Sequence, residues 1–402
     1  MPTKKAPMPA PDTFPDLLLA LTAVSGELPT SQVSRLPGAM TYKQKAITQI
    51  KKDNLLNAYS RNNLRGYRLT SASKRALIEQ YPERYQSLLS GETSLNAPKY
   101  SQKHRARLHR MAEVLVSMLN AGALVFPWEK PAIFQPDGDS PDLPATQSAY
   151  YTSLEVKEIG PQGRKIRGSR STGLLFTEDA IYAVYNTGPA DMRWDYRAEA
   201  RLKALMQTDV CKYRLHGQYA SHQLYALLFV DDMSQLAKML EDAKEEHEAD
   251  ASVAAEGVSG REAASKAKTG YFLLHGSYEH FFCLTNDRRG EMILRFLTER
   301  ETKASLDALL MNGLRPENSG WGLEHDAFDK DGTPVLFGYS CDLPRVKRFA
   351  EALDKRGMRG MLICFDFQKA ALKQLCGDHV EFQCIDPDAV EEAVFDQLEK
   401  TD

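Results

Sequence analysis

The sequence predicts a multidomain protein of mixed α+β and α/β class, and three observations support this. Between Ser25 and Glu79 the expected order is short helix, tight turn, basic helix, polar hairpin and capped helix, which is the order of a winged helix-turn-helix. Strand and helix patterns alternate again through residues 149–243 and from residue 334 onward, as in βαβ arrangements. With 402 residues, 43% of them hydrophobic, the chain is long enough for two or three ordinary cores.

Changes in composition divide the chain into six segments. We expect a mobile leader (1–12), a winged helix-turn-helix domain (13–82), a connector (83–100), a central α/β domain (101–240), a charged linker or insertion (241–268) and a C-terminal α/β region (269–402). The leader is rich in Pro, Ala and Lys, the connector is polar, and the segment after Glu241 has few large apolar residues. Segments of such composition rarely bury enough apolar surface to pack.

The helix-turn-helix pattern begins at Pro29. Thr30 or Ser31 is a plausible N-cap for a short helix that Pro37-Gly38 stops. Thr41 then caps a helix over 42–53, in which Ala46, Ile47 and Ile50 form the apolar face. The polar residues of this segment are expected to face a DNA groove: Thr41, Tyr42, Lys43, Gln44, Lys45, Thr48, Gln49, Lys51 and Lys52.

A hairpin follows the basic helix. Residues 54–60 and 67–70 read as strands, joined by a turn over 61–66 in which Asn63 and Gly66 suit the positive φ of a hairpin tip. This wing carries the remaining expected DNA contacts: Arg61, Asn62, Asn63, Arg65 and Arg68. Thr70-Ser71 then caps a helix that ends before Pro82.

Charge is unevenly distributed. Residues 1–125 hold 18 Lys and Arg against 8 Asp and Glu, a balance of +10, which leaves −13 for the rest and −3 overall. Affinity for DNA rises with the number of phosphates neutralised, with log K falling against log salt by roughly 0.9 per phosphate. A basic N-terminal third on an acidic body therefore favours double-stranded DNA as a partner. The alternative is that the basic helix is merely a solvated face.

Cysteine usage and hydropathy indicate a cytoplasmic location. The cysteines have no C-x-x-C pair and several lie in apolar runs, which is typical of reduced core thiols; they are Cys211, Cys283, Cys341, Cys364, Cys376 and Cys384. The apolar stretch 17–24 fits the first helix of the winged domain better than a signal core. No apolar run reaches the length of about 20 residues that a membrane span needs.

The periodicity of the remaining chain predicts an α-β-β-β-α-β-α order, followed by further alternation. A long helix over 101–121 precedes strands at 149–156, 172–176 and 180–185, a helix at 194–207, a strand at 224–230 and a helix at 233–243. Residues 127–144 are an expected loop. Strands are then expected at 271–275, 279–285, 334–339, 360–365 and 380–385, with helices at 303–312, 344–355, 368–376 and from Asp388.

Several of these features together resemble the replication-relaxation family of plasmids and conjugative elements of Gram-positive bacteria. They are the opening Leu21–Gly26, the helix-turn-helix, the step Tyr67-Arg-Leu-Thr70 into a helix, the His-containing helix near 104–121, and the strand-turn-strand 173–186 followed by a helix. The resemblance covers roughly residues 13–230. It implies a winged helix fused to a restriction-endonuclease-like α/β core, acting on the DNA of a mobile element.

The residues argue against nuclease activity in that core. A PD-(D/E)xK nuclease needs an Asp at the start of the second core strand, and an acid and a Lys two residues apart on the third, to hold a divalent ion and orient water. Here the second strand begins at 171–173 as Ser-Thr-Gly, and the third reads Ala183-Val-Tyr-Asn186. Glu178 and Asp179 lie in the turn between them. We therefore expect a degenerate core without catalysis, used for dimerisation or DNA contact.

Three functional hypotheses follow. The first is a DNA-binding accessory or regulatory protein of a mobile element, needing no cofactor or metal, with a second copy of the chain and relaxase or replication proteins as further partners. The second is a metal-dependent nuclease. The third is a ligand-responsive transcription regulator, with a pocket at the carboxyl ends of the C-terminal strands near Ser340 and Asp366.

Overall fold

The structure is a computed structural model of the chain. It describes residues 8–90, 101–134, 147–158, 166, 168–189, 192–215, 218–220, 222–255, 266–274, 276–316 and 323–395. Residues 1–7 of the expected leader, the second half of the connector and much of the loop 127–144 lie outside these residues. Within the part described, no helix combines the length and apolar character needed to cross a bilayer.

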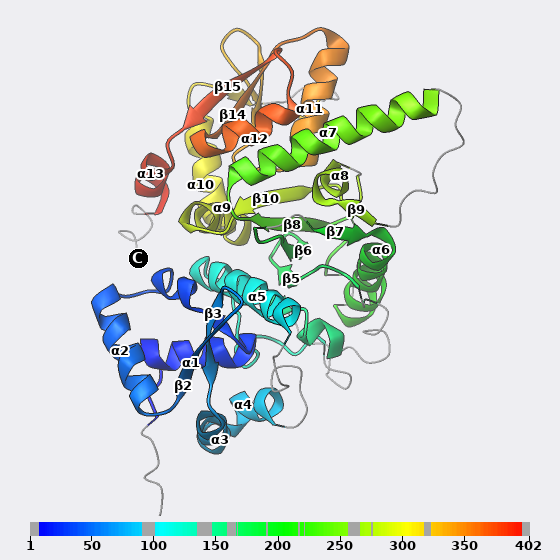
Figure 1. Ribbon diagram of the computed structural model, residues 1–402. Helices are drawn as coiled ribbons and strands as arrows, with labels where there is room; N and C mark the ends of the chain where they lie inside the picture. Colours follow the sequence, from blue (N-terminus) through cyan, green and yellow to red (C-terminus); the bar gives the residue numbers. More distant parts are fainter. Residues whose placement is uncertain are drawn as a thin grey trace, which may run out of the picture.

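Residues 14–89 form a compact N-terminal unit, drawn in blue in Figure 1. Its elements are α1 (Phe14–Ser25), β1 (Leu28–Pro29), the 3₁₀ helix η1 (Thr30–Ser34), α2 (Met40–Lys52), β2 (Leu56–Arg61), β3 (Leu64–Leu69), α3 (Ser71–Gln80) and α4 (Pro82–Leu89). The strands form an antiparallel sheet in the order β1-β3-β2.

Local chemistry explains the boundaries of these elements. Gly26 ends α1 in the left-handed conformation, with φ +74°, and Thr70 caps α3 by accepting a hydrogen bond from the Ser73 amide at 3.0 Å, as predicted. Two expectations were wrong: the short helix is 3₁₀ and has no side-chain N-cap, and Thr41 lies inside α2. The first residues of the expected connector belong to a helix, α4.

A mixed sheet forms the centre of the molecule, in the order β10-β8-β6-β5-β4. It comprises β4 (Ala149–Thr152), β5 (Gly173–Phe176), β6 (Ile181–Asn186), β8 (Leu224–Val230) and β10 (Phe281–Thr285). Strands β4, β5 and β6 form an antiparallel meander, whereas β6, β8 and β10 are parallel. Strand β10 lies beyond the predicted boundary at residue 269, so the C-terminal region contributes to this sheet.

Helices surround the central sheet. They are α5 (Gln102–Asn120), α6 (Tyr196–Leu205, continuing as a π-helix over Met206–Arg214), α7 (Met233–Ala255), α8 (Thr269–Leu274), α9 (Arg288–Thr298) and α10 (Arg300–Leu310). The sequence did not predict α9, and it ended α7 too early. Residues 271–275 were predicted as a strand, but the described ones lie in α8, where Gly270 packs so closely on the Met239 carbonyl of α7 that a Cβ would lie 1.9 Å from its oxygen.

The C-terminal sheet has the order β11-β12-β13-β14-β15. Strands β13 (Pro334–Phe337), β14 (Gly360–Phe365) and β15 (Val380–Ile385) are parallel and joined through α11 (Leu343–Arg356) and α12 (Lys369–Leu372), as the βαβ pattern predicts. The short β11 (Arg315–Pro316) and β12 (Ala327–Phe328) add antiparallel pairs. A two-stranded ladder joins β7 (Arg193–Asp195) to β9 (Lys266–Lys268), and α13 (Pro387–Val390) follows β15.

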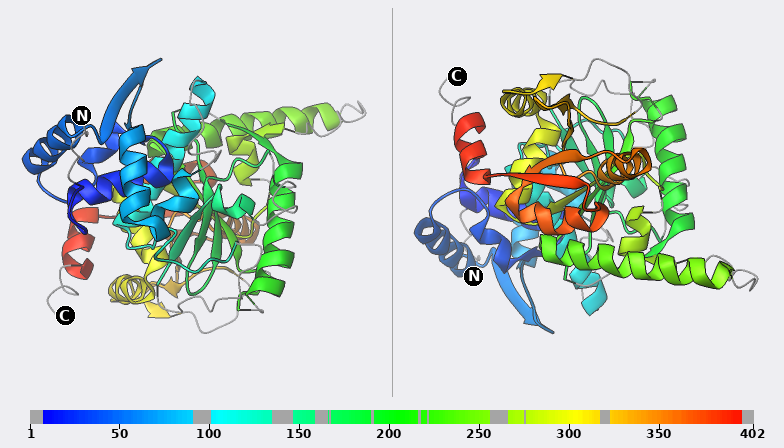
Figure 2. Two further views of the ribbon diagram at one scale, coloured as in Figure 1. Left: turned by 90° about the horizontal axis from the view of Figure 1, so that it is seen from below. Right: turned by 90° about the horizontal axis from the view of Figure 1, so that it is seen from above.

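Two hydrophobic cores lie on the two faces of the central sheet. One face, with Leu175, Val184 and Leu227, packs with α5 and α9, and this core continues into α1 and α2 of the N-terminal unit. The other face, with Leu174 and Ala183, packs with α6, α7 and α8. Figure 1 shows α5 lying between the N-terminal unit and the central sheet. Both views of Figure 2 show the β2–β3 hairpin projecting from the body beside the start of α5.

Candidate nucleic-acid interface

Helix α2 presents a polar face to solvent. Ala46, Ile47 and Ile50 are buried against the N-terminal unit, as their spacing predicts. The exposed side chains are those of Thr41, Tyr42, Gln44, Lys45, Thr48, Gln49, Lys51 and Lys52. Tyr42 is 49% exposed, which is unusual for a large aromatic residue. This face carries three lysines together with amide and hydroxyl groups, the side-chain types that contact phosphates and base edges.

Lys43 does not belong to that face, contrary to the prediction. It is only 2% exposed, because it lies three and four residues before Ala46 and Ile47 and therefore on the apolar side of the helix. Its Nζ donates hydrogen bonds to the backbone carbonyl oxygens of Leu36 at 2.6 Å and Ser34 at 3.2 Å. Lys43 thus ties the turn after η1 to α2 and is not available to DNA.

The hairpin tip is a two-residue turn. Asn62 and Asn63 have φ of +52° and +61°, the conformation of a type I′ turn, which matches the twist of the strands. The positive φ predicted for Asn63 is confirmed. Gly66 instead lies within β3 with ordinary strand geometry, so that prediction was wrong. Arg61, Asn62, Asn63 and Arg65 are all exposed at or near the tip.

Arg68 faces inward from β3, although it was expected on the wing surface. Its Nε and Nη2 donate to Oε2 of Glu27 at 2.9 and 2.8 Å. Glu27, in the bend between α1 and β1, is completely buried. Arg105 and His109 of α5 also contact this carboxylate. Arg105 Nη2 lies 2.6 Å and His109 Nε2 lies 2.9 Å from Glu27 Oε1. One buried carboxylate therefore joins the hairpin to α5.

Arg105 also binds the hairpin backbone. It donates to the carbonyl oxygens of Arg61 at 2.9 Å and Leu64 at 3.0 Å, on either side of the turn. Burial by itself raises the pKa of Glu27, but hydrogen bonds from His109, Arg105 and Arg68 outweigh burial and lower that pKa to about 2. The carboxylate is therefore ionised, and the projecting hairpin is held in one orientation. Sequence reasoning missed Glu27, because its partners lie 41, 78 and 82 residues further along the chain.

A second polar cluster joins the N-terminal unit to the body. Arg35, just after η1, donates to Glu291 of α9 at 2.5 Å, to Ser117 of α5 at 2.7 Å and to Asn286 after β10 at 2.9 Å. Asn120 also donates to Glu291 at 2.8 Å. Because these side chains come from three distant segments, the cluster fixes α2 and the hairpin relative to the central sheet.

The residues considered for nuclease chemistry are separated in the structure. Glu178 and Asp179 lie in the β5–β6 turn, at the opposite end of these strands from Gly173 and Asn186, and Glu178 pairs with Arg300 at 3.1 Å. Asn186 instead donates to the half-buried Glu113 of α5 at 3.0 Å. Among the described residues, no three His, Cys, Asp or Glu side chains form a group suited to a metal ion.

A ligand pocket was expected near Ser340 and Asp366, at the carboxyl ends of the C-terminal strands. Gln368 spans this region. This buried side chain accepts from the Phe365 amide at 3.0 Å and donates to the Tyr339 carbonyl at 2.7 Å, so it links the ends of β13 and β14. The six cysteines are free. Cys211, Cys283, Cys341 and Cys364 are buried as predicted, whereas Cys376 is half-buried and Cys384 is exposed.

Comparison with protein-family models, with curated proteins and with solved structures gives no match. The chemistry of the exposed α2 face and of the hairpin tip is therefore what points to a function. Both belong to one unit and both are cationic. The ion pairs of Glu27 with Arg68 and Arg105 hold the hairpin, and the Lys43 hydrogen bonds tie α2 to the preceding turn.

Proposed function

We propose that this chain is a cytoplasmic DNA-binding accessory or regulatory protein of a mobile genetic element, acting in plasmid replication, relaxation or conjugative transfer. The observation that carries the proposal is the pairing of the exposed face of α2 with the arginine-bearing hairpin tip in one unit. In a winged helix-turn-helix, the helix after the turn enters the major groove and the wing contacts the backbone. The association with a mobile element is inferred from the resemblance to the replication-relaxation family.

The element order of the N-terminal unit supports a winged-helix assignment. Helix α1, strand β1, the short helix η1, helix α2 and the hairpin β2–β3 follow one another, and β1 pairs with β3. In this arrangement α2 is the recognition helix. Gln44, Lys45, Thr48 and Gln49 lie over its second and third turns and are the residues placed to reach base edges.

We assign the central sheet a binding role and no catalytic step. Its α-β-β-β-α-β order is compatible with a restriction-endonuclease-like core. The places where a metal-dependent nuclease needs its acids and its lysine are occupied by Ser171, Thr172, Val184, Tyr185 and Asn186. Side chains without a negative charge are poor ligands for Mg²⁺. The core then serves to contact DNA, a second copy of the chain, or relaxase and replication proteins of the element.

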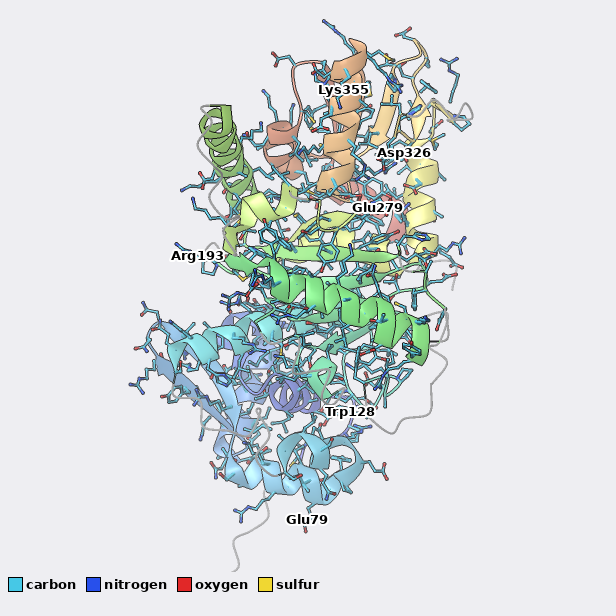
Figure 3. The ribbon with its side chains drawn as sticks, turned by 90° about the vertical axis from the view of Figure 1, so that its right-hand side faces the viewer. Glu79, Trp128, Arg193, Glu279, Asp326 and Lys355 are labelled. Carbon is cyan, nitrogen blue, oxygen red and sulfur yellow. The ribbon has the colours of Figure 1, made fainter. Side chains whose placement is uncertain are left out.

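The test is a gel shift with the DNA that flanks the gene, compared with an unrelated duplex, at about 150 mM salt, where nonspecific binding is weak. The variant Gln44→Ala/Lys45→Glu changes two exposed residues of α2 and is expected to abolish the preference for the flanking DNA while leaving the melting temperature unchanged. Lys355→Glu is the charge control, since Lys355 is exposed at the opposite end of the molecule from the N-terminal unit (Figure 3). Equal affinity of wild type and α2 variant would overturn the proposal.

A further inference from the structure

Three arginines from two segments, α5 and the residues just before β5, lie near the end of the central sheet where β6 finishes. We infer that Arg107, Arg110 and Arg170 bind a phosphate group of the DNA backbone. The inference rests on the proposed function and extends it, since it places a second DNA contact outside the N-terminal unit. It also gives a role to Arg107 and Arg110, two of the cations in the basic first half of α5.

The positions of the three side chains follow from their contacts. Arg107 and Arg110 lie one turn apart on α5; Arg107 donates to Ser153 Oγ at 3.3 Å. The side chain of Arg110 lies against Gly188, where a Cβ would stand 3.4 Å from Arg110 Cδ. Arg170, just before β5, donates from Nε to the Arg193 carbonyl at 3.1 Å. Figure 3 places Arg193 where the body meets the N-terminal unit.

None of the three guanidinium groups forms a salt bridge with a carboxylate of the described residues. The two nearby acids are engaged elsewhere. Glu113 accepts the Asn186 amide at 3.0 Å, and Glu199 accepts the Arg170 backbone amide at 2.7 Å and the Tyr185 hydroxyl at 2.9 Å. Glu199 therefore orients the segment that carries Arg170 but forms no salt bridge with its guanidinium group, although the two charges still attract each other.

The cluster is electrostatically unfavourable without a further anion. Burial lowers the pKa of Arg107, and the charge of Arg170 lowers it further. Burial is also the main cause that lowers the pKa of Arg110, with Arg170 and Arg107 adding to it while Glu113 opposes it. Arg110 is half-buried, whereas Arg107 and Arg170 are exposed beside it. Three like charges in one place are stabilised best by an anion with several acceptor oxygens, and the planar guanidinium group matches phosphate geometry.

The location favours a phosphate of DNA over a free one. Arg110 follows Arg105 by five residues on α5, which is about 7.5 Å along the helix, and Arg105 holds the backbone on both sides of the hairpin tip. The hairpin and the start of α5 project on the same side of the body (Figure 2). A DNA backbone that contacts Arg61 at the hairpin tip can therefore continue along α5 to the exposed Arg107 and then to the other two arginines of the cluster.

The experiment compares the full chain with Arg110→Gln/Arg170→Gln and with a control, Lys355→Gln/Arg359→Gln, which removes two exposed cations from the far end of the molecule. Melting temperatures are measured in inorganic phosphate and in chloride of equal ionic strength. Affinity for the flanking duplex is then measured at several salt concentrations. Without phosphate, the cluster variant should melt no lower than wild type, because removing like charges relieves repulsion.

We expect phosphate to raise the melting temperature of wild type and control but not of the cluster variant. The variant should bind duplex about tenfold more weakly, with a salt slope less steep by about 0.9. Identical phosphate responses in all three proteins would overturn the site. A phosphate response lost in the variant with an unchanged salt slope would mean a free phosphate occupies it, which overturns the DNA occupant. If wild type binds no duplex, the proposed function fails, while the phosphate response still tests the cluster.

Discussion

Arg105 Nη2 lies 2.6 Å from Oε1 of Glu27, and this contact fixes the hairpin on α5. Both side chains are almost completely buried, at 2% and 0% exposure. A buried ion pair is stabilising only when further hydrogen bonds satisfy both groups. That condition is met here, since Arg68 and His109 also bind the carboxylate and the hairpin carbonyls accept the remaining Arg105 protons.

Replacing Glu27 by Gln should therefore destabilise the protein strongly. The change leaves the buried Arg105 and the half-buried Arg68 without a counter-ion, and breaking a buried pair typically costs about 3–5 kcal/mol. Urea unfolding at neutral pH measures the loss. Glu83→Gln, on the exposed surface of α4, is the control and should lie within about 0.5 kcal/mol of wild type.

The same pair predicts a pH dependence. Because the folded pKa of Glu27, about 2, lies below its ordinary value of about 4.3, its stabilising contribution is complete above that ordinary value and is lost as the pH falls from about 4.3 toward 2. Wild type should therefore lose more free energy of unfolding across this range than Glu27→Gln does. Parallel pH profiles for the two proteins would contradict the assignment.

The success of sequence reasoning depended on how local the determining contacts are. Strand β8 matches its predicted bounds, 224–230, because seven consecutive strongly apolar or aromatic residues leave little choice. The cap at Thr70 was predictable because its partner is three residues away. Glu27 and Arg35 gave no such sign, since their partners lie on segments far along the chain.

Lys43 shows a different limit. Its residue type indicates an exposed position, whereas its spacing from Ile47 and Ile50 indicates the buried face, and the spacing was decisive. A lysine can occupy that face because two carbonyl oxygens of the preceding turn receive its ammonium group. The prediction of a strand at 271–275 was wrong for a related reason. A short apolar run fits either element, and the contact of Gly270 with α7 selects a helix.

Lys43→Met should cost stability without a direct effect on DNA. Methionine keeps most of the apolar stem but leaves the carbonyl oxygens of Leu36 and Ser34 unsatisfied, which costs about 1–3 kcal/mol. Lys45→Met, two residues away on the exposed face, is the matched control and should change stability by less than about 0.5 kcal/mol. Thermal unfolding separates the two; equal melting temperatures would show that the Lys43 contacts contribute nothing.

The wing arginines should divide into two groups. Arg61→Gln and Arg65→Gln are expected to weaken binding to all duplexes alike and to make the salt slope less steep by about 0.9 each, as for phosphate contacts. Arg68→Gln should instead lower stability, because it removes a partner of Glu27. Salt titrations of duplex affinity check the first group and urea unfolding the second. A loss confined to the preferred DNA site would mean that Arg61 or Arg65 reads bases.

Arg35 and Glu291 should be energetically coupled across the junction between the N-terminal unit and the body. Arg35→Met and Glu291→Gln each break a half-buried, charge-assisted contact. In a double-mutant cycle, the second change should cost less in the presence of the first, with a coupling energy of about 1–3 kcal/mol. Additive effects would show that the two side chains lie close together without contributing to the junction.

The last prediction concerns Gly66, which lies in β3 directly against Glu27. A Cβ at this position would stand 2.6 Å from both Cγ and Oε1 of Glu27. Such a contact is easily relieved when the neighbouring side chain is free to move, but Arg68, Arg105 and His109 hold this one. Gly66→Ala should therefore destabilise the protein by about 1–3 kcal/mol through overpacking. In a Glu27→Ala background the obstacle is gone, so the same substitution should be nearly neutral. Urea unfolding of the four proteins tests this, and an equal cost of Gly66→Ala in both backgrounds would show that backbone conformation, not the fixed carboxylate, requires the glycine.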